Sequence, residues 1–388
     1  MKKLNLYSAV FLACMTIAGC SDKDSLTSVN EETTLKSASV AAKYIVVLKN
    51  DATIANSDFT SRNAKVKEKA QGLLKKYAIT GKVEEVYETA LQGFTVKIAP
   101  GQAKRLGEDV NVMYVEADKV IALSPIEMYG KPAPQPVAQS VPWGITRVNG
   151  GVSAVGKTAW IIDTGIDLNH PDLTVDVNRS RTFLGANTTP DDQNGHGTHV
   201  SGTIAAKDND IGVVGVAAGA TVVAVRVLDR RGSGFTSGVI AGVNYVAANG
   251  VAGDVANMSL GGGVSTSLDD AVLGASKSVK FALAAGNESD NANNHSPARV
   301  NGNNIYTVSA MDKNDKFAYF SNYGNPPVDY CAPGVSIYSA YKDGGYATLS
   351  GTSMATPHVA GILLLGAVRS DSYVQGDPDK TPDPIAEH

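Results

Sequence analysis

The sequence contains little cysteine, no surplus of basic residues, and only a short apolar run at its start. Three of its 388 residues are cysteine, and the formal net charge is −4. Without a basic surplus, nucleic acid is not an expected partner. Hydrophobic residues make up 43% of the chain. At this length a large buried core and more than one domain are expected, which is enough for an enzyme.

Complete motifs for an aspartic protease or for a zinc site are also missing. Asp-Thr-Gly occurs once, at Asp163, and Asp-Ser-Gly does not occur. A two-lobed aspartic protease needs two carboxylates that share a proton, so that class is excluded. No His-Glu-x-x-His motif or Cys/His cluster supplies the third ligand that zinc would need beside His196 and His199. A zinc site is therefore a minor alternative.

The N-terminus has the pattern of an export signal. Two lysines precede the apolar run 4–18, which is too short to span a membrane, and small residues lead to Cys20. Residues 17–20 resemble a bacterial lipobox, in which the cysteine is lipidated; a plain signal peptide is the alternative. With Cys14 removed and Cys20 acylated, Cys331 has no disulfide partner. Another stabilising element, such as a bound metal, is then expected.

The rest of the chain divides into four regions. Residues 21–42 are polar and aperiodic, as in a flexible tether. Residues 43–123 alternate strand and helix patterns and predict a small α+β domain, with a helix near 62–77. Residues 124–142 are proline-rich and predict a linker open to proteolysis. Residues 143–388 predict one large domain.

The large domain shows the pattern of a parallel sheet. Continuous apolar runs predict strands, and amphipathic stretches between them predict helices. In a doubly wound sheet of this kind, functional residues lie just beyond the carboxyl ends of strands. The expected strands are 158–162, 221–227, 255–258, 279–284 and 305–308, and the expected helices are 198–206, 238–248 and 267–276.

Three polar residues lie at such strand ends or helix starts. Asp163 ends a buried strand, where its carboxylate needs a hydrogen-bond donor, although an aspartate that begins a turn is an alternative. His196 is flanked by glycines that allow another element to come close, and it could act as a base or be structural. Ser353 begins an apolar helix, as serine often does, and there the backbone N–H groups could also stabilise an oxyanion.

Asp163, His196 and Ser353 follow one another in one of the known chain orders of a serine triad. The segments IIDTGID, NGHGTHVSGT and GTSMATPHVAG resemble the three catalytic blocks of the subtilisin-like serine proteases, the subtilases. The resemblance covers residues 143–361. It implies a subtilisin-like doubly wound α/β fold, with Ser353 as nucleophile, His196 as general base and Asp163 as its partner. His199 would be structural.

The resemblance also implies an oxyanion site and a substrate cleft. Asn287 follows a strand and would donate its amide to the oxyanion together with the backbone N–H of Ser353. Glycine-rich edges would let an extended peptide add as a strand, so that a broad endopeptidase with an apolar or aromatic first pocket is implied. The implied cleft residues are Gly232, Ser233, Gly234, Ser259, Leu260, Gly261, Ala284 and Gly286.

A calcium site is implied by the loop 206–213. This loop resembles the calcium loop of bacterial subtilisins, and an all-oxygen ligand set suits Ca²⁺. Aspartate accounts for 21 of the 24 acidic residues after position 123, which agrees with a hard-cation site. A solvated Asp/Asn loop is the alternative. The implied ligands are Asp172, Lys207, Asn209, Ile211 and Val213.

Residues 43–123 resemble the inhibitory propeptide of the same family, through YIVVLK, LQGFTVKI and YVEADKVIAL. The resemblance implies a small ferredoxin-like α+β domain whose C-terminal end occupies the cleft until self-cleavage between about residues 118 and 140. We expect an exported, monomeric zymogen acting on proteins or peptides. A lipid on Cys20 would be its one link to a bacterial outer membrane or cell surface, and processing would release the catalytic domain.

Some features leave alternatives open. The chain ends soon after the serine helix, so closing elements found in relatives could be absent or replaced. By the resemblance, the Asn/Asp-rich segment 288–296 borders the first pocket, so the size of that pocket cannot be read from the sequence. A non-catalytic binding lipoprotein on the same fold would be favoured by loss of a triad residue, and none is lost. An amidase or esterase would use the same nucleophile on another substrate.

Overall fold

The computed structural model describes residues 40–133 and 137–388. The expected export signal, Cys20 and nearly all of the tether lie outside these residues. None of the helices in the described ranges is both long enough and apolar enough to cross a membrane. The only cysteine in those ranges, Cys331, is buried and free.

The N-terminal domain is an antiparallel sheet covered by helices. Its strands lie in the order β2-β3-β1-β4. With two crossover helices, this is the predicted ferredoxin-like arrangement. The short helix α3, which begins at a proline, was not predicted. The elements are β1 (Ala42–Leu48), α1 (Ala52–Ala55), α2 (Phe59–Lys76), β2 (Val83–Tyr87), β3 (Gly93–Ile98), α3 (Pro100–Gly107) and β4 (Val112–Ala117).

The large domain is built on an eight-stranded sheet, in which β9 pairs with β12 beside the path β10-β12-β8-β14-β16-β18-β19. All of its pairings are parallel, as predicted. The edge strand β19 was not predicted. The strands are β8 (Thr158–Asp163), β9 (Thr174–Val175), β10 (Arg181–Thr182), β12 (Thr221–Arg226), β14 (Val255–Met258), β16 (Lys280–Ala284), β18 (Ile305–Met311) and β19 (Val328–Pro333).

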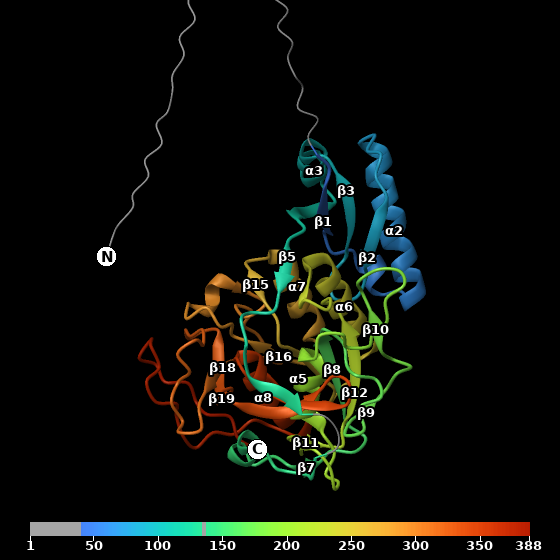
Figure 1. Ribbon diagram of the computed structural model, residues 1–388. Helices are drawn as coiled ribbons and strands as arrows, with labels where there is room; N and C mark the ends of the chain where they lie inside the picture. Colours follow the sequence, from blue (N-terminus) through green and yellow to red (C-terminus); the bar gives the residue numbers. More distant parts are fainter. Residues whose placement is uncertain (1–39, 134–136) are drawn as a thin grey trace, which may run out of the picture. The chain divides into compact units, whose positions relative to one another are not determined.

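Helices cover both faces of this sheet (Figure 1). In β8, Ala159 and Ile161 join the core under α5 and α8, whereas Trp160 and Ile162 join the core under α6 and α7. Because successive side chains point to opposite faces, a strand buried on both faces must be apolar throughout. The helices are α4 (Trp143–Arg147), α5 (His196–Ala205), α6 (Thr236–Asn249), α7 (Thr266–Ala275) and α8 (Thr352–Leu365), with a short 3-10 turn η1 (Ala292–Asn294).

The structure differs from the prediction in residues 120–133. The predicted propeptide strand β5 (Val120–Ala122) pairs with β13 (Ser233–Phe235) of the large domain and not with the propeptide sheet. The predicted linker contains β6 (Glu127–Ala133), which pairs with β21. Neither segment shows a clear alternation of apolar and polar residues. Each is ordered as a strand by its partner in the large domain. The remaining strands are β7 (Val152–Ser153), β11 (Ala217–Ala218), β15 (Gly262–Gly263), β17 (His295–Ser296), β20 (Ile337–Tyr341) and β21 (Gly345–Ser350).

The C-terminal tail is anchored to the large domain. Ile385 is buried and bridges to Cys331 of β19. Arg147 of α4 forms ion pairs with Asp315 at 2.9 Å and with Glu387 at 2.5 Å. The polar tail thus acts as a closing element of this domain.

Candidate active site

Asp163 and His196 meet at the carboxyl edge of the sheet. Asp163 is the last residue of β8 and His196 the first of α5, and both are fully buried. The Nδ1 atom of His196 lies 2.8 Å from Oδ1 of Asp163. The other ring nitrogen, Nε2, makes no hydrogen bond to the part of the chain that the structure describes. The ring is therefore oriented by a carboxylate, with its second nitrogen free for proton transfer.

Glycines on both sides make this approach possible, as the sequence predicted. Gly195 has a φ of 111°, and a Cβ there would lie 2.2 Å from the ring of Tyr341. A Cβ on Gly197 would lie 2.1 Å from the carbonyl oxygen of Gly165, in the turn after β8. Any larger residue at either position would push α5 away from Asp163.

Asp192 organises the same turn and was missed at the sequence level. Its carboxylate accepts hydrogen bonds from the hydroxyl of Thr164 at 2.9 Å, from the backbone of Gly195 at 2.9 Å and from the backbone of Thr198 at 3.0 Å. These bonds tie the turn after β8 to the first turn of α5. An aspartate just before a helix start is the signal that could have identified it.

Ser353 is the second residue of α8, so its oxygen lies at the helix N-terminus. Its Oγ donates to the carbonyl oxygen of Ser259 at 3.1 Å, while the hydroxyl of Ser259 donates to the carbonyl oxygen of Ser353 at 2.8 Å. Asn257 donates to the same Ser259 hydroxyl at 2.9 Å. Ser259, a predicted cleft residue, thus holds Ser353 in place, and the Ser353 hydroxyl is not bonded to His196 in this state.

Asn287 lies beside the start of α8. Its Oδ1 accepts from the backbone N–H and the hydroxyl of Thr352, each at 2.8 Å. These two bonds fix which way the amide points, so that Nδ2 donates to the carbonyl oxygen of Pro125 at 2.9 Å. A carbonyl group therefore sits where Asn287 was predicted to bind an oxyanion. Thr352, which aims the amide, was not predicted.

A strand of the chain itself lies in the predicted cleft. Ala122 of β5 pairs with Ser233 of β13 on one side and bridges to Gly261 on the other. The backbone N–H of Leu123 donates to the carbonyl oxygen of Gly232 at 2.9 Å. In Figure 1 this is the teal ribbon labelled β5. The glycine-rich edges bind an extended segment through main-chain hydrogen bonds.

A small pocket opens beside Ser353. Its lining includes three further predicted cleft residues, namely Leu260, Ala284 and Gly286, together with Ser124. Glu288 and His295 also line it. Two residues of the segment 288–296 therefore border the pocket beside Ser353. The Nε2 atom of His295 lies 3.1 Å from Oδ2 of Asp290, so polar groups lie at the edge of this pocket.

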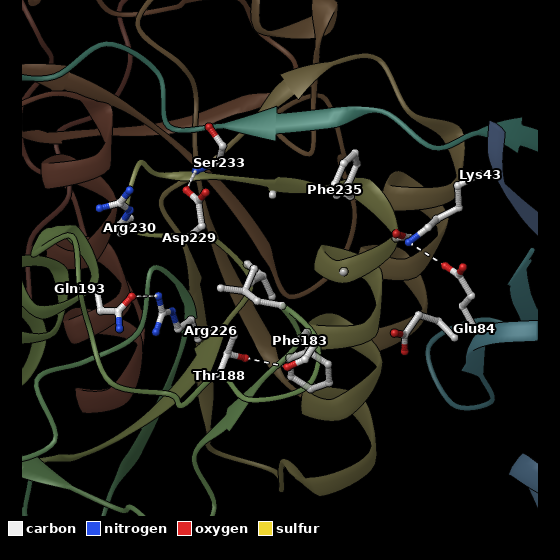
Figure 2. Close-up of a pocket in the computed structure, with 17 residues that line it drawn as sticks. Lys43, Glu84, Phe183, Thr188, Gln193, Arg226, Asp229, Arg230, Ser233 and Phe235 are labelled. Carbon is white, nitrogen blue, oxygen red and sulfur yellow. Dashed lines mark hydrogen bonds and ion pairs between the residues drawn. The ribbon is translucent and has the colours of Figure 1, made fainter. Parts of the chain in front are cut away.

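A larger cavity of about 610 Å³ lies next to β13 (Figure 2). Figure 2 shows the Arg226 guanidinium bonded to Gln193 on one side, and the Lys43–Glu84 ion pair of the N-terminal domain on the other. Ser353 does not line this cavity. The pocket that contains Ser353 is therefore the smaller of the two.

The comparisons with known proteins agree with this geometry. The sequence pattern of the subtilase family matches residues 158–373, more than half of the chain. The chain belongs to the subtilase family. The pattern of the peptidase inhibitor I9 family matches residues 43–124, so this subtilase carries its propeptide domain. The family is one of serine endopeptidases, and the sequence-level assignment of family and fold is confirmed.

Two relatives and one solved structure are similar to this subtilase. Alkaline serine exoprotease A of Vibrio alginolyticus is 41% identical over 340 positions, covering 84% of this chain and 60% of that protein. The extracellular serine proteinase of Thermus sp. strain Rt41A is 36% identical over 411 positions, covering 100% and 93%. The crystal structure of a cold-adapted subtilisin-like serine proteinase is 47% identical, with a TM-score of 0.52 over 57% of this chain and 83% of that one.

The predicted calcium loop folds against Asp172. This carboxylate is fully buried and accepts from the Asn209 amide and the Val213 backbone, each at 3.0 Å. The same loop contains the other two predicted ligands, Lys207 and Ile211. Gln139, which was not predicted, bonds the loop from the N-terminal side. Burial raises the pKa of Asp172, and only neutral groups donate to it. A buried carboxylate whose hydrogen-bond donors are all neutral fits a hard cation.

Two further histidines, His199 and His358, are buried near the site. His199 is buried, and its Nε2 bonds to the carbonyl oxygens of Ile337 at 3.0 Å and Ala347 at 3.2 Å. Burial, followed by the charge of His196, lowers the pKa of His199 to about 3. Burial likewise lowers the pKa of His358 to about 4. Both rings therefore stay neutral at ordinary pH and hold backbone in place.

Proposed function

We propose that this subtilase hydrolyses peptide bonds of extended protein substrates through an acyl-enzyme formed on Ser353. The observation that carries the proposal is the buried hydrogen bond between Asp163 and His196, beside a serine at a helix N-terminus. Ser353 would attack the carbonyl carbon while Nε2 of His196 takes its proton. Asp163 would hold the ring and stabilise the imidazolium.

Oxyanion stabilisation is assigned to Asn287 and the backbone N–H of Ser353. The amide of Asn287 is held by two bonds from Thr352 and already binds a carbonyl oxygen. Such a fixed donor needs no reorganisation when charge develops on the oxygen. When the tetrahedral intermediate collapses, His196 would protonate the leaving amine, and water would then hydrolyse the ester by the reverse proton path.

The proposed substrates are proteins or peptides in extended form. The way β5 is held between β13 and Gly261 supports this, because main-chain pairing accepts many side chains. The apolar walls of the pocket beside Ser353, formed by Leu260 and Ala284 among others, support a preference for an apolar or aromatic residue there. The catalytic domain is proposed to act as a monomer.

A structural Ca²⁺ ion is proposed at the loop 206–213. Its ligands would be the side chains of Asp172 and Asn209 and the backbone carbonyls of Lys207, Ile211 and Val213. When bound, the ion would supply the positive charge that the buried Asp172 otherwise lacks. It would stabilise the fold and take no part in the chemistry.

Export and lipid attachment are proposed from the sequence of residues 1–20. The Thermus relative is named an extracellular proteinase, which supports export of this chain. A lipid on Cys20 would anchor the propeptide at the cell surface, and processing would release the catalytic domain. Mass spectrometry of membrane and culture fractions tests this: active protein found in the medium with residues 21–42 still attached would contradict it.

The test of the activity is a matched pair of serine variants. Ser353→Ala should lose casein hydrolysis by on the order of 10⁶-fold and should no longer react with a serine-directed phosphonofluoridate. Ser278→Ala, an exposed serine outside the site, should behave as the wild type. Retained hydrolysis or labelling in Ser353→Ala would show that another group is the nucleophile.

A further inference from the structure

Residues 120–133, here called the strap, lie along the cleft on both sides of Ser353. The strap pairs with β13 as β5, passes the pocket beside Ser353, and continues as β6 on β21. Because the chain runs from β5 past the serine to β6, β6 takes the place of the part of a substrate that follows the cut bond. The contacts of β6 therefore show which side chains that half of the cleft can bind.

The backbone sets the register of β6 against β21. Asn287, the proposed oxyanion donor, holds the carbonyl oxygen of Pro125 at 2.9 Å. Two residues further along the strap, Glu127 pairs with Ser350, the last residue of β21. A substrate whose carbonyl oxygen lies in the same place would therefore put the second residue after its cut bond opposite Ser350.

The carboxylate of Glu127 is held by two tyrosine hydroxyls. Tyr319 donates to Oε1 and Tyr129 donates to Oε2, each at 2.5 Å. The bonds from Tyr129 and from Tyr319 lower the pKa of Glu127, so this carboxylate is charged. Tyr129 belongs to the strap and lies on the same face of β6 as Glu127, because side chains alternate along a strand. Tyr319 belongs to the catalytic domain and remains there when the strap leaves.

Tyr319 is fixed at its backbone and ring, while its hydroxyl is open to the cleft. Its carbonyl oxygen accepts from the hydroxyl of Ser289 at 2.7 Å, and its ring lies edge-on to that of Phe320, with 5.4 Å between the ring centres. The residue is nevertheless 77% exposed, so a substrate can reach it. Tyr319 and Phe320 line a cavity of about 230 Å³ together with Asn287, which places the tyrosine beside the oxyanion donor.

One acidic residue of the catalytic domain, Glu288, also lines this cavity. Its carboxylate accepts from the amide of Asn322 at 2.7 Å, whereas the hydroxyl of Tyr319 is directed at Glu127 of the strap. The tyrosine therefore offers its hydrogen to a residue that lies in the cleft and not to its own domain.

We propose that Tyr319 is a specificity-determining residue, which binds an acidic side chain at the second residue after the cut bond. This rests on the proposed function and names a preferred class among its substrates, namely extended segments with a glutamate at that place. A hydrogen bond to a charged acceptor is stronger than one to a neutral acceptor, so glutamate is favoured over glutamine there. In the full chain, Glu127 of the strap occupies this site.

The test measures kcat/KM on internally quenched peptides, with the active enzyme that the full chain yields on processing. Each peptide has phenylalanine before the cut and isoleucine after it, followed by one glutamate at the second, third or fourth residue; matched peptides have glutamine instead. Mass spectrometry confirms where each is cut. Glutamate at the second residue should raise kcat/KM about three- to tenfold over glutamine, with no such gain at the third or fourth. Equal values at the second residue, or a gain at another residue, would overturn the proposal.

A pair of tyrosine variants assigns the preference to one hydroxyl. Tyr319→Phe removes the hydroxyl and keeps the ring, so it should cut the glutamine peptides like the wild type and show no gain with glutamate. Tyr373→Phe, at an exposed tyrosine of the C-terminal tail, is the matched control and should retain the gain. A gain that survives in Tyr319→Phe would contradict the role of Tyr319.

The same peptides separate this inference from the proposed function. An enzyme that cuts every peptide at the same rate would refute the role of Tyr319 alone. An enzyme that cuts none of them and reacts with no serine reagent would refute the proposed function itself.

Discussion

Two buried carboxylates near the same sheet, Asp163 and Asp172, differ in their partners. Asp163 is bonded to a histidine ring, whereas Asp172 is bonded to an amide, a backbone N–H and, at 3.3 Å, a tyrosine hydroxyl. Both are fully buried. A carboxylate bonded to a group that can take up a proton, such as a histidine ring, can take part in catalysis. A carboxylate bonded only to neutral donors keeps a negative charge that a bound cation can balance. Burial alone therefore does not distinguish the two roles.

Replacing each aspartate by asparagine should separate the roles. Asp163→Asn should lower kcat about 10⁴-fold with little change in melting temperature, because the amide would hold the wrong tautomer of His196. Asp172→Asn should keep kcat and lower the melting temperature. Peptide hydrolysis and thermal unfolding, measured on both variants after removal of the propeptide, check this. Equal losses of activity in the two variants would contradict the division.

In the catalytic site that contains Asp163, removing the oxyanion donor should cause the next largest loss of activity. Asn287→Ala should lower kcat by roughly 10²- to 10³-fold with little change in KM. Thr352→Val should lose up to about tenfold, since one of the two bonds that aim the amide is removed. Thr352→Ser retains that bond and is the matched control. Steady-state kinetics at one pH measures all three, and a Thr352→Val variant equal to Thr352→Ser would refute the aiming role.

On the Asp172 side, removing calcium should destabilise the protein. At free Ca²⁺ about 100-fold above the dissociation constant, the free energy of unfolding should exceed that of the chelated protein by about 2.7 kcal/mol. Asp172→Asn should abolish most of this difference. Asp210→Asn, an exposed aspartate in the same loop, should retain it. Chemical unfolding with and without chelator is the measurement, and a wild type indifferent to chelator would refute the site.

The effect that is smallest near neutral pH concerns His199, whose partners are carbonyl oxygens where His196 has a carboxylate. Its folded pKa of about 3 lies below the ordinary 6.5, so the unfolded chain binds the proton more readily. Its contribution is complete above pH 6.5 and is lost as pH falls towards 3, by up to about 1.4 kcal/mol per pH unit. His199→Gln should flatten the stability profile between pH 4 and 6. His388→Gln is the control, because the ring of His388 is not buried in this way, and it should leave the stability profile unchanged.

The sequence predicted the elements whose burial is uniform. Strands such as β8 and β12 are apolar between their end residues because both faces of the sheet are covered, and this pattern is visible without coordinates. The polar residues that interrupt the pattern at strand ends and helix starts, Asp163 and His196, were recognisable for the same reason. Their mutual contact follows from the parallel sheet, in which such ends meet at one edge.

The sequence did not predict residues that act through a partner far along the chain. Thr352 aims Asn287 across 65 positions, and Gln139 reaches Asn209 across 70. β6 lies in a proline-rich segment without alternation and becomes a strand because β21 offers it an edge. Each of these depends on tertiary contact, which local propensity does not encode.

Residues 120–133 pair with both β13 and β21, and this double pairing has a consequence for the free catalytic domain. Once residues 120–133 leave, an open strand edge lies on each side of Ser353. A long substrate can pair with both edges, whereas a short chromogenic peptide that ends at its leaving group can pair with only one. Rates measured on such short peptides would therefore underestimate the selectivity of this enzyme for proteins, because the contacts with one of the two strand edges would be missing from the assay.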